Sequence, residues 1–257
     1  MAAIYTAPDA TLWPSATTTG VPAGTVLTPH KGDLATTQDY QIIDAVDVQG
    51  GGILIRHNHV MVTRCRIKAP SGAVSPIGIR VMDGKVGTQV TRCEIDMNMC
   101  EAGTGIGYAN YVIQGCNIHG AMKSVQIGDS VMVFDCWIHD PYIGGSSHTE
   151  PVGIFGSETP THSVIRHNRM ENLHSQTAVV FIKTDQGPVQ DVIVDHNWLE
   201  GGNYTVYSVV GYWDHKTPPT GVQFTSNVFG RGFVYGPRNY EGLVAWSGNR
   251  WDDGSPL

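Results

Sequence analysis

Residues 192–199 read VIVDHNWL, and the same pattern of residue types occurs seven more times along the chain. Each copy has a short β-branched segment, one or two polar residues, Cys or Asn, any residue, and a large apolar residue. The other copies are VMVTRCRI (60–67), TQVTRCEI (88–95), YVIQGCNI (111–118), VMVFDCWI (131–138), SVIRHNRM (163–170), VQFTSNVF (222–229) and VAWSGNRW (244–251). The closing apolar residues are 20 to 32 residues apart, a period typical of stacked repeats.

A second short strand is predicted before most of these copies, in residues 77–81, 124–127, 153–155, 178–182, 206–210 and 233–235. Two or three short strands in each period fit one coil of a solenoid. An antiparallel sandwich needs hairpins with two-residue turns at even spacing, and these are few. We therefore predict an all-β chain that folds as a single-stranded, right-handed parallel β-helix of about eight coils.

Stacking places like residues above one another in neighbouring coils, about 4.8 Å apart. The Cys or Asn of each copy is therefore predicted to form one internal ladder, made of Cys65, Cys93, Cys116, Cys136, Asn168, Asn197, Asn227 and Asn249. Asn side chains in such a column can bond to one another and to the turn backbone, and Cys fills the same niche as a small hydrophobe. We expect free thiols throughout, with Cys100 in a loop. His167 and His196 each precede a ladder Asn and are predicted to be turn residues.

The charge and hydrophobicity of the chain limit the kinds of partner that it can bind. The 257 residues carry a formal charge of −7 with only 16 Lys and Arg, which argues against a nucleic-acid partner and mildly against a polyanionic one. A locally basic cleft would overrule the second inference. No stretch is long and apolar enough for a membrane span, and the first residues do not read as a signal peptide. We expect one domain, with residues 1–50 as N-terminal cap and first strands and residues 51–257 as the β-helix.

Several stretches resemble right-handed parallel β-helix proteins of actinobacteria and of their phages. They are DATLWPSATTTGVPAGTVLT (9–28), FIKTDQGPVQDVIVDHNWLEGGNYTVYS (181–208), GRGFVYGP (230–237) and AWSGNRWDD (245–253). The resemblance implies the fold and a class that includes polysaccharide lyases, glycoside hydrolases, epimerases and phage tailspikes. Related sequences carry His-x-Asp-Gly-Ile in the long-loop coil. Here the matching stretch is HTEPVGI (148–154), with Glu in place of Asp and two additional residues.

The longest interval contains the loop HDPYIGGSSHTEPVGIF (139–155), where His148 and Glu150 precede a strand. A carboxylate and an imidazole there could act as general acid and base on a glycosidic bond or a uronate proton. The alternative is that they only order a polar loop. Lys183 and Asp185 leave the strand of the next coil and could join them, with Lys183 as a base, or form an ordinary ion pair at a turn. His139, Asp140, His148 and Glu150 carry side chains that can bind a metal, but they form no compact ligand motif, so we predict no metal. We also predict no cofactor.

Aromatic residues are concentrated in the C-terminal third of the chain. Aromatic faces stack on sugar rings, and Arg supplies directional hydrogen bonds. The predicted substrate-binding residues are Tyr207, Trp213, Tyr235 and Arg238.

These observations favour a carbohydrate-directed β-helix protein of a phage tail that binds a host cell-surface polysaccharide. Whether it also cleaves the polysaccharide stays open. A secreted polysaccharide lyase or glycoside hydrolase is an alternative, and so is a structural or adhesive module without catalysis. The sequence leaves open whether the protein is an enzyme and whether it assembles as a homotrimer or within a tail. The expected location is the virion or the extracellular space.

Overall fold

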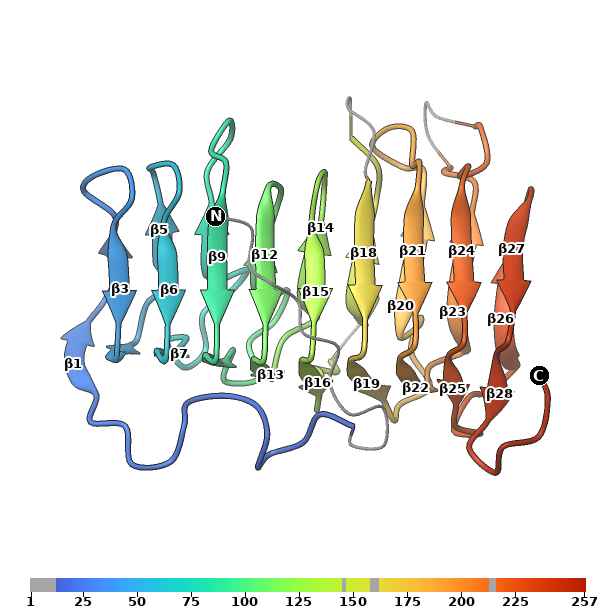
Figure 1. Ribbon diagram of the computed structural model, residues 1–257, viewed down its shortest axis with the longest axis horizontal. Coiled ribbons are helices and arrows are strands. Elements are labelled where there is room, and N and C mark those ends of the chain that lie inside the picture. Colours follow the sequence, from blue (N-terminus) through green and yellow to red (C-terminus); the bar gives the residue numbers. More distant parts are fainter. Residues whose placement is uncertain (1–12, 145–146, 158–161, 213–215) are drawn as a thin grey trace.

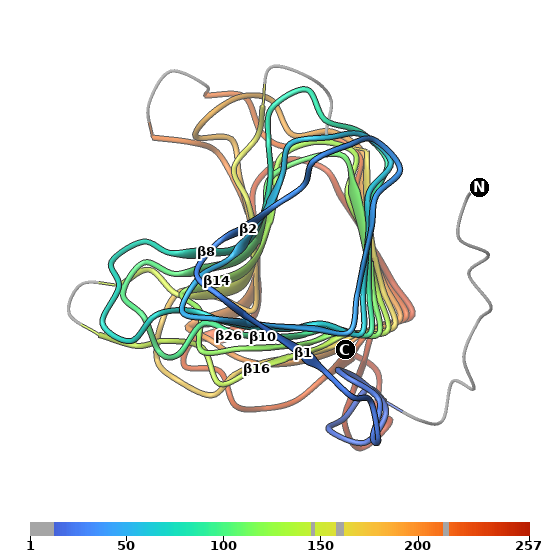
Figure 2. The ribbon, with the colours of Figure 1, turned by 90° about the vertical axis from the view of Figure 1, so that its left-hand side faces the viewer.

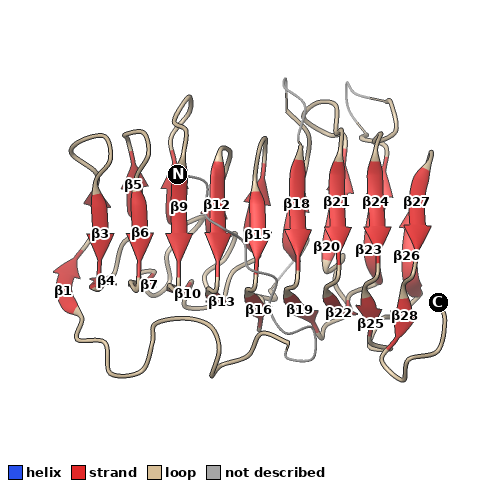
Figure 3. Cartoon of the chain, in the orientation of Figure 1, coloured by secondary structure: helices blue, strands red, loops and turns tan. Residues whose placement is uncertain are grey.

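The computed structural model describes residues 13–144, 147–157, 162–212 and 216–257, and every regular element in these ranges is a β-strand (Figures 1 and 3). The strands form three parallel sheets that run side by side along the length of the molecule and enclose one core (Figure 2). The predicted parallel β-helix is therefore confirmed.

The bounds of the strands show the repeat directly. The first sheet has ten strands: β1 (Thr28–Lys31), β4 (Val46–Gln49), β7 (Arg66–Lys68), β10 (Glu94–Asp96), β13 (Asn117–His119), β16 (Trp137–His139), β19 (Arg169–Asn172), β22 (Trp198–Gly201), β25 (Val228–Phe229) and β28 (Arg250–Trp251). The second has nine: β2 (Leu34–Ala35), β5 (Ile53–Ile55), β8 (Ile77–Val81), β11 (Thr104–Gly107), β14 (Lys123–Ile127), β17 (Glu150–Ile154), β20 (Val180–Lys183), β23 (Tyr204–Val209) and β26 (Gly236–Tyr240). The third also has nine: β3 (Ile42–Asp44), β6 (Met61–Thr63), β9 (Thr88–Thr91), β12 (Tyr111–Gln114), β15 (Met132–Phe134), β18 (Ser163–Arg166), β21 (Val192–Asp195), β24 (Val222–Thr225) and β27 (Val244–Ser247).

Each copy of the sequence pattern is one corner of a coil, from a strand of the third sheet into a strand of the first. Ile95 pairs with Ile67 on one side and with Ile118 on the other, and all three side chains are fully buried. Burying such a side chain stabilises the fold by about 1.5–3 kcal/mol. The stack has one more corner than the eight copies, because Val46 stands at the ladder position of the first coil, where its N–H contacts Cys65 Sγ.

The ladder is present as predicted. The backbone N–H of Asn168 donates to Asn197 Oδ1 at 2.9 Å, and that of Asn197 donates to Asn227 Oδ1 at 2.9 Å. In the first half the acceptors are sulfur atoms, as in Cys93 N–H to Cys116 Sγ at 3.3 Å. All five cysteines are free, and Cys100 lies in a turn, where it is buried.

A left-handed residue precedes most ladder positions. The φ angles are 52° at Arg64, 54° at Asp135 and 53° at both His167 and His196, and Gly115 occupies the same place with 64°. This conformation turns the chain sharply into the first sheet, and Asp, His and Gly tolerate it better than most residues. The prediction that His167 and His196 are turn residues is confirmed.

The two ends of the stack differ. At the C-terminal end, Trp246 packs against the core, and its Nε1 donates to the Leu257 carbonyl at 3.5 Å. Near the N-terminus, strands β1 to β4 already stack as coils, whereas residues 13–27 run along the outside of the stack (Figure 1). They are fixed by Trp13, which stacks on His167, and by the Gly20 N–H, which donates to the Gly115 carbonyl at 2.9 Å. We call residues 13–27, which belong to the expected N-terminal cap, the strap.

In the described ranges, no helix has the length and apolar character that crossing a membrane requires.

Candidate active site

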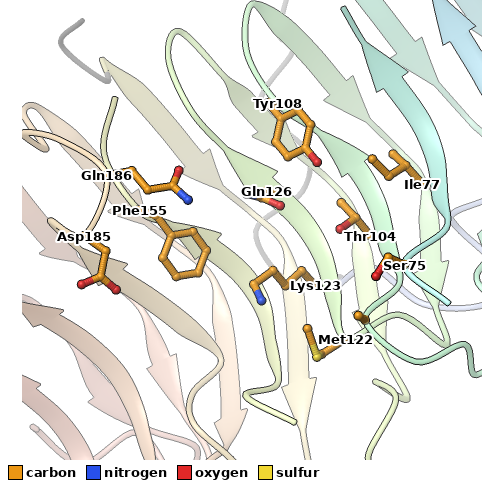
Figure 4. A pocket seen from close by; sticks show the side chains of 11 residues that line it. Ser75, Ile77, Thr104, Tyr108, Met122, Lys123, Gln126, Phe155, Asp185 and Gln186 are labelled. Atoms are coloured by element: carbon orange, nitrogen blue, oxygen red, sulfur yellow. The ribbon is translucent and has the colours of Figure 1, made fainter. Parts of the chain in front are cut away.

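The outer face of the second sheet carries a groove. Two adjoining hollows of about 590 Å³ each share Tyr108, Gln126, Phe155 and Gln186 in their walls, so they form one depression. Figure 4 shows the side chains that line the first hollow. A third hollow of about 440 Å³ meets the first at Ser75 and Ile77 and extends it toward the N-terminal coils. The groove thus follows the stacking direction across several coils.

The strand β14 supplies the floor of the groove. Val125 and Ile127 are buried in the core, while Lys123 and Gln126 point outward and line the first hollow. Lys123 is in register with Glu150 at the start of the next strand, β17. Parallel stacking therefore places an ammonium and a carboxyl group side by side.

Lys123 and Glu150 form an ion pair with Nζ 3.3 Å from Oε1. The Glu150 side chain is 1% exposed and that of Lys123 is 20% exposed. The second oxygen, Oε2, is buried and has no hydrogen-bond partner among the described residues. Burial raises the pKa of Glu150 to about 7, although Lys123 and Lys183 act in the opposite direction. A carboxyl group that titrates near neutral pH is suited to proton transfer.

Asp185 lines the first hollow of the groove and is paired with the buried Lys183. Lys183 Nζ lies 2.8 Å from Asp185 Oδ2 and 3.8 Å from the centre of the Tyr212 ring. Asp185 Oδ1 also accepts the Tyr212 backbone N–H at 3.0 Å. These contacts hold Lys183 in place, and its charge acts on Glu150 across the face.

A row of aromatic rings continues the same face toward the C-terminal coils. The Phe155 and Phe181 rings are 6.0 Å apart, Phe181 and Tyr207 are 5.3 Å apart, and Tyr204 lies 5.4 Å from Tyr207 and 5.6 Å from Tyr235. Phe181 and Tyr207 are in register on β20 and β23. Such a row can stack against the faces of sugar rings.

The structure brings three of the four predicted catalytic residues to this face, namely Glu150, Lys183 and Asp185. His148 is exposed in the loop before β17 and does not line the groove. His139 and Asp140 bond to each other at 2.8 Å, and His139 lies on β16 of the first sheet. In the described parts of the chain, no group of three or more His, Cys, Asp and Glu residues is placed to hold a metal ion.

The predicted substrate-binding residues do not all lie on the same surface. Tyr207 and Tyr235 belong to the aromatic row, and Tyr235 is 67% exposed. Arg238 does not belong to it. It is in register with the core residue Val206, and its guanidinium lies 4.5 Å from the Trp246 ring, so it closes the C-terminal end of the stack. Trp213 lies outside the described residues.

Four residues of the groove are not among those predicted from sequence: Tyr108, Lys123, Gln126 and Phe155. The strand 124–127 is predicted, but the sequence points to a site only in the long loop and in the coils after it. The signal available was register: one coil before Glu150, the residue at the start of the equivalent strand is Lys123.

No protein-family model matches the chain, and no curated protein matches it. A crystal structure of the pectate lyase Pel9A is similar, with a TM-score of 0.45 and 12% sequence identity, over 86% of this chain and 58% of that one. This chain thus spans less than two thirds of that protein's length.

Proposed function

We propose that this protein binds an elongated glycan along the outer face of the second sheet and that Glu150 transfers a proton on it. The observation that carries the proposal is the Lys123–Glu150 pair, in which Lys123 lines the groove and Glu150 is buried beside it with one carboxyl oxygen unpartnered among the described residues.

The arrangement of the face favours a linear polymer as ligand. Coils repeat about every 4.8 Å, so a chain that lies along the stack meets a new row of side chains at each step. The rows offer an amide and a cation at Gln126 and Lys123, followed by the rings of Phe155, Phe181 and Tyr207. Amides and cations bond hydroxyl and carboxylate groups, and the rings stack on pyranose faces.

Proton abstraction suits the site better than hydrolysis. Glycoside hydrolysis ordinarily uses two carboxyl groups that flank the bond, and on this face the other carboxylate of the proposed site, Asp185, is held by Lys183 at 2.8 Å. In an elimination, Glu150 would take the C5 proton of a uronate, and the C–H electrons would form the C4–C5 double bond. The C4 oxygen would leave with its electron pair and take a proton from water. Lys123 would bind the uronate carboxylate and stabilise the developing charge.

The setting that we propose is a phage tail in contact with host surface polysaccharide, and its support is the sequence resemblance alone. A secreted lyase would use the same site. An adhesive module would bind the glycan in the groove without proton transfer by Glu150.

The test uses a panel of acidic and neutral polysaccharides, with retardation of the protein in polysaccharide-containing gels as the binding assay. We expect an acidic glycan to bind, and Lys123→Ala to weaken binding about tenfold, which corresponds to about 1.4 kcal/mol. The matched control is Lys68→Ala, which removes a similar ion pair, Lys68–Asp96 at 3.1 Å, from the first sheet. Equal effects of the two substitutions, or no binding to any member of the panel, would overturn the proposal.

Catalysis is read separately, from the ultraviolet absorbance of the unsaturated product. Glu150→Gln should retain binding and lower the rate by about 10²-fold or more, the range for loss of a general base. If wild-type protein binds a glycan and forms no product, the adhesive module is the function.

A further inference from the structure

Glu150 does not reach the groove that it is proposed to serve. Phe155 and Lys123 line the first hollow, and Glu150 does not. The carboxyl group is buried, whereas the Phe155 ring is only half-buried and faces the open groove (Figure 4). The Lys123 Nζ lies 5.4 Å from the centre of that ring. Lys123 and Phe155 together therefore form the wall between the groove and the acid.

Gly153 provides the seat for the ring. An ideal Cβ at this position would lie 2.8 Å from Phe155 Cε2 and 3.3 Å from Glu150 Cγ, so the ring and the acid side chain crowd the same point above the strand. The register partners of Gly153 are Gln126 and Phe181, so neighbouring coils accept large side chains in this column. The glycine is needed for space and not for a special backbone conformation.

We propose that Phe155 is a positioning residue whose ring, seated over Gly153, shields Glu150 from water and separates it from the groove. The inference builds on the proposed function, because it assigns the residue that controls access to the acid. Several observations support it: the buried Glu150 side chain, its Oε2 with no partner in the described part of the chain, and the pKa of about 7 that burial produces. On this proposal a ligand in the groove meets Glu150 only when the ring turns aside, because Phe155 lines the hollow and Glu150 does not.

The test requires no glycan. Side-chain carboxyl groups are followed by ¹³C NMR as a function of pH, and the Glu150 signal is assigned by its loss in Glu150→Gln. In wild-type protein we expect this signal to titrate near neutral pH. In Phe155→Ala water reaches the carboxylate, and the pKa should fall toward its ordinary value of 4.5, by one unit or more, a tenfold change in proton affinity.

Two further variants separate shielding from general damage. Phe155→Leu keeps an apolar cover and should largely restore the neutral titration. Gly153→Ala displaces the ring without removing it and should act like Phe155→Ala. The control is Phe134→Ala, which removes a half-buried ring from the third sheet, and circular dichroism checks that each variant is folded.

An unchanged Glu150 titration in folded Phe155→Ala protein would overturn the proposal, whatever binds in the groove. A shifted titration in a protein that binds no glycan would instead support the shield and remove the proposed function. The two failures are therefore distinguishable.

Discussion

Single side chains in the ladder each support two coils. Asn197 Oδ1 accepts the Asn168 backbone N–H, while its Nδ2 donates to the carbonyls of Ile165 and Asp195 at 2.9 and 3.0 Å. All of these groups lie at a corner where water has no access to Asn197. An unpartnered buried backbone group costs about 1–3 kcal/mol.

We therefore expect Asn197→Ala to lower the free energy of unfolding by about 3 kcal/mol, because it leaves the buried Asn168 N–H without this acceptor and removes the bonds from Nδ2 to two carbonyls. Asn197→Cys should cost less, since Cys serves at the same position in the first half of the ladder. Urea titration followed by circular dichroism measures the change. Asn239→Ala, at an exposed position on β26, is the control, and an equal loss in the two variants would contradict the role of the ladder.

At the scale of elements, the strap of residues 13–27 is held at its start by an aromatic contact. The Trp13 ring lies 5.5 Å from the rings of both His167 and His196. Both Nε2 atoms are buried and have no hydrogen-bond partner in the described parts of the chain, whereas His167 Nδ1 bonds to Asp135 at 2.8 Å. Burial and the neighbouring His167 lower the pKa of His196.

A folded-state pKa below the ordinary value of 6.5 means that the docked form binds protons less readily than the released form. The contact thus stabilises the strap above that value and weakens as the pH falls below it. The charged groups whose interactions act on His196 are Asp195, which opposes the shift, and Arg166 and Arg250, which favour it.

We predict that amide hydrogen exchange in residues 13–27 becomes faster when the pH falls from about 7 to about 5, after correction for the intrinsic rate. Replacement of both His167 and His196 by Gln should remove most of this dependence, and Trp13→Ala should give fast exchange at both values. His30→Gln is the control outside the contact. A pH dependence that persists in the double variant would rule out the histidine pair as its cause.

For the whole molecule, stability is expected to follow the order of the coils, since each coil contacts mainly its neighbours. At the C-terminal end the Leu257 N–H donates to the Asn249 carbonyl at 3.2 Å, and the tail covers Trp246. Deletion of residues 252–257 should therefore reduce hydrogen-exchange protection in β27 and β24 by about tenfold or more, and leave β6 and β9 unchanged. A uniform loss along the stack would contradict this one-dimensional behaviour.

The parallel β-helix could be predicted from sequence because its packing rule is repeated. Equivalent corners must all fit the same narrow column, so Cys93, Asn197 and the other ladder residues report one constraint many times. Outward positions carry no such constraint. Lys123 and Glu150 meet through register alone, and nothing in their local sequence marks the pair.

Two placements that sequence alone does not give have physical causes. Arg238 lies in a core column of the last coil that the structure describes, at the end of the second sheet, where a charged residue is tolerated. In sequence, a cluster of aromatic and basic residues therefore looks the same whether it binds a sugar or covers the end of the β-helix. The position of the strap depends on Trp13, whose partners lie more than 150 residues away in sequence.

The left-handed corner has an implication for how the protein can change in length. Since Asp135, His167 and His196 each start an equivalent unit, a duplicated unit would meet the same junction on both sides. Gene duplication within the chain can then lengthen the molecule in steps of about 4.8 Å and add one binding row each time. The length of polymer that the protein contacts would then change with the number of coils, while the residues around Glu150 stay the same.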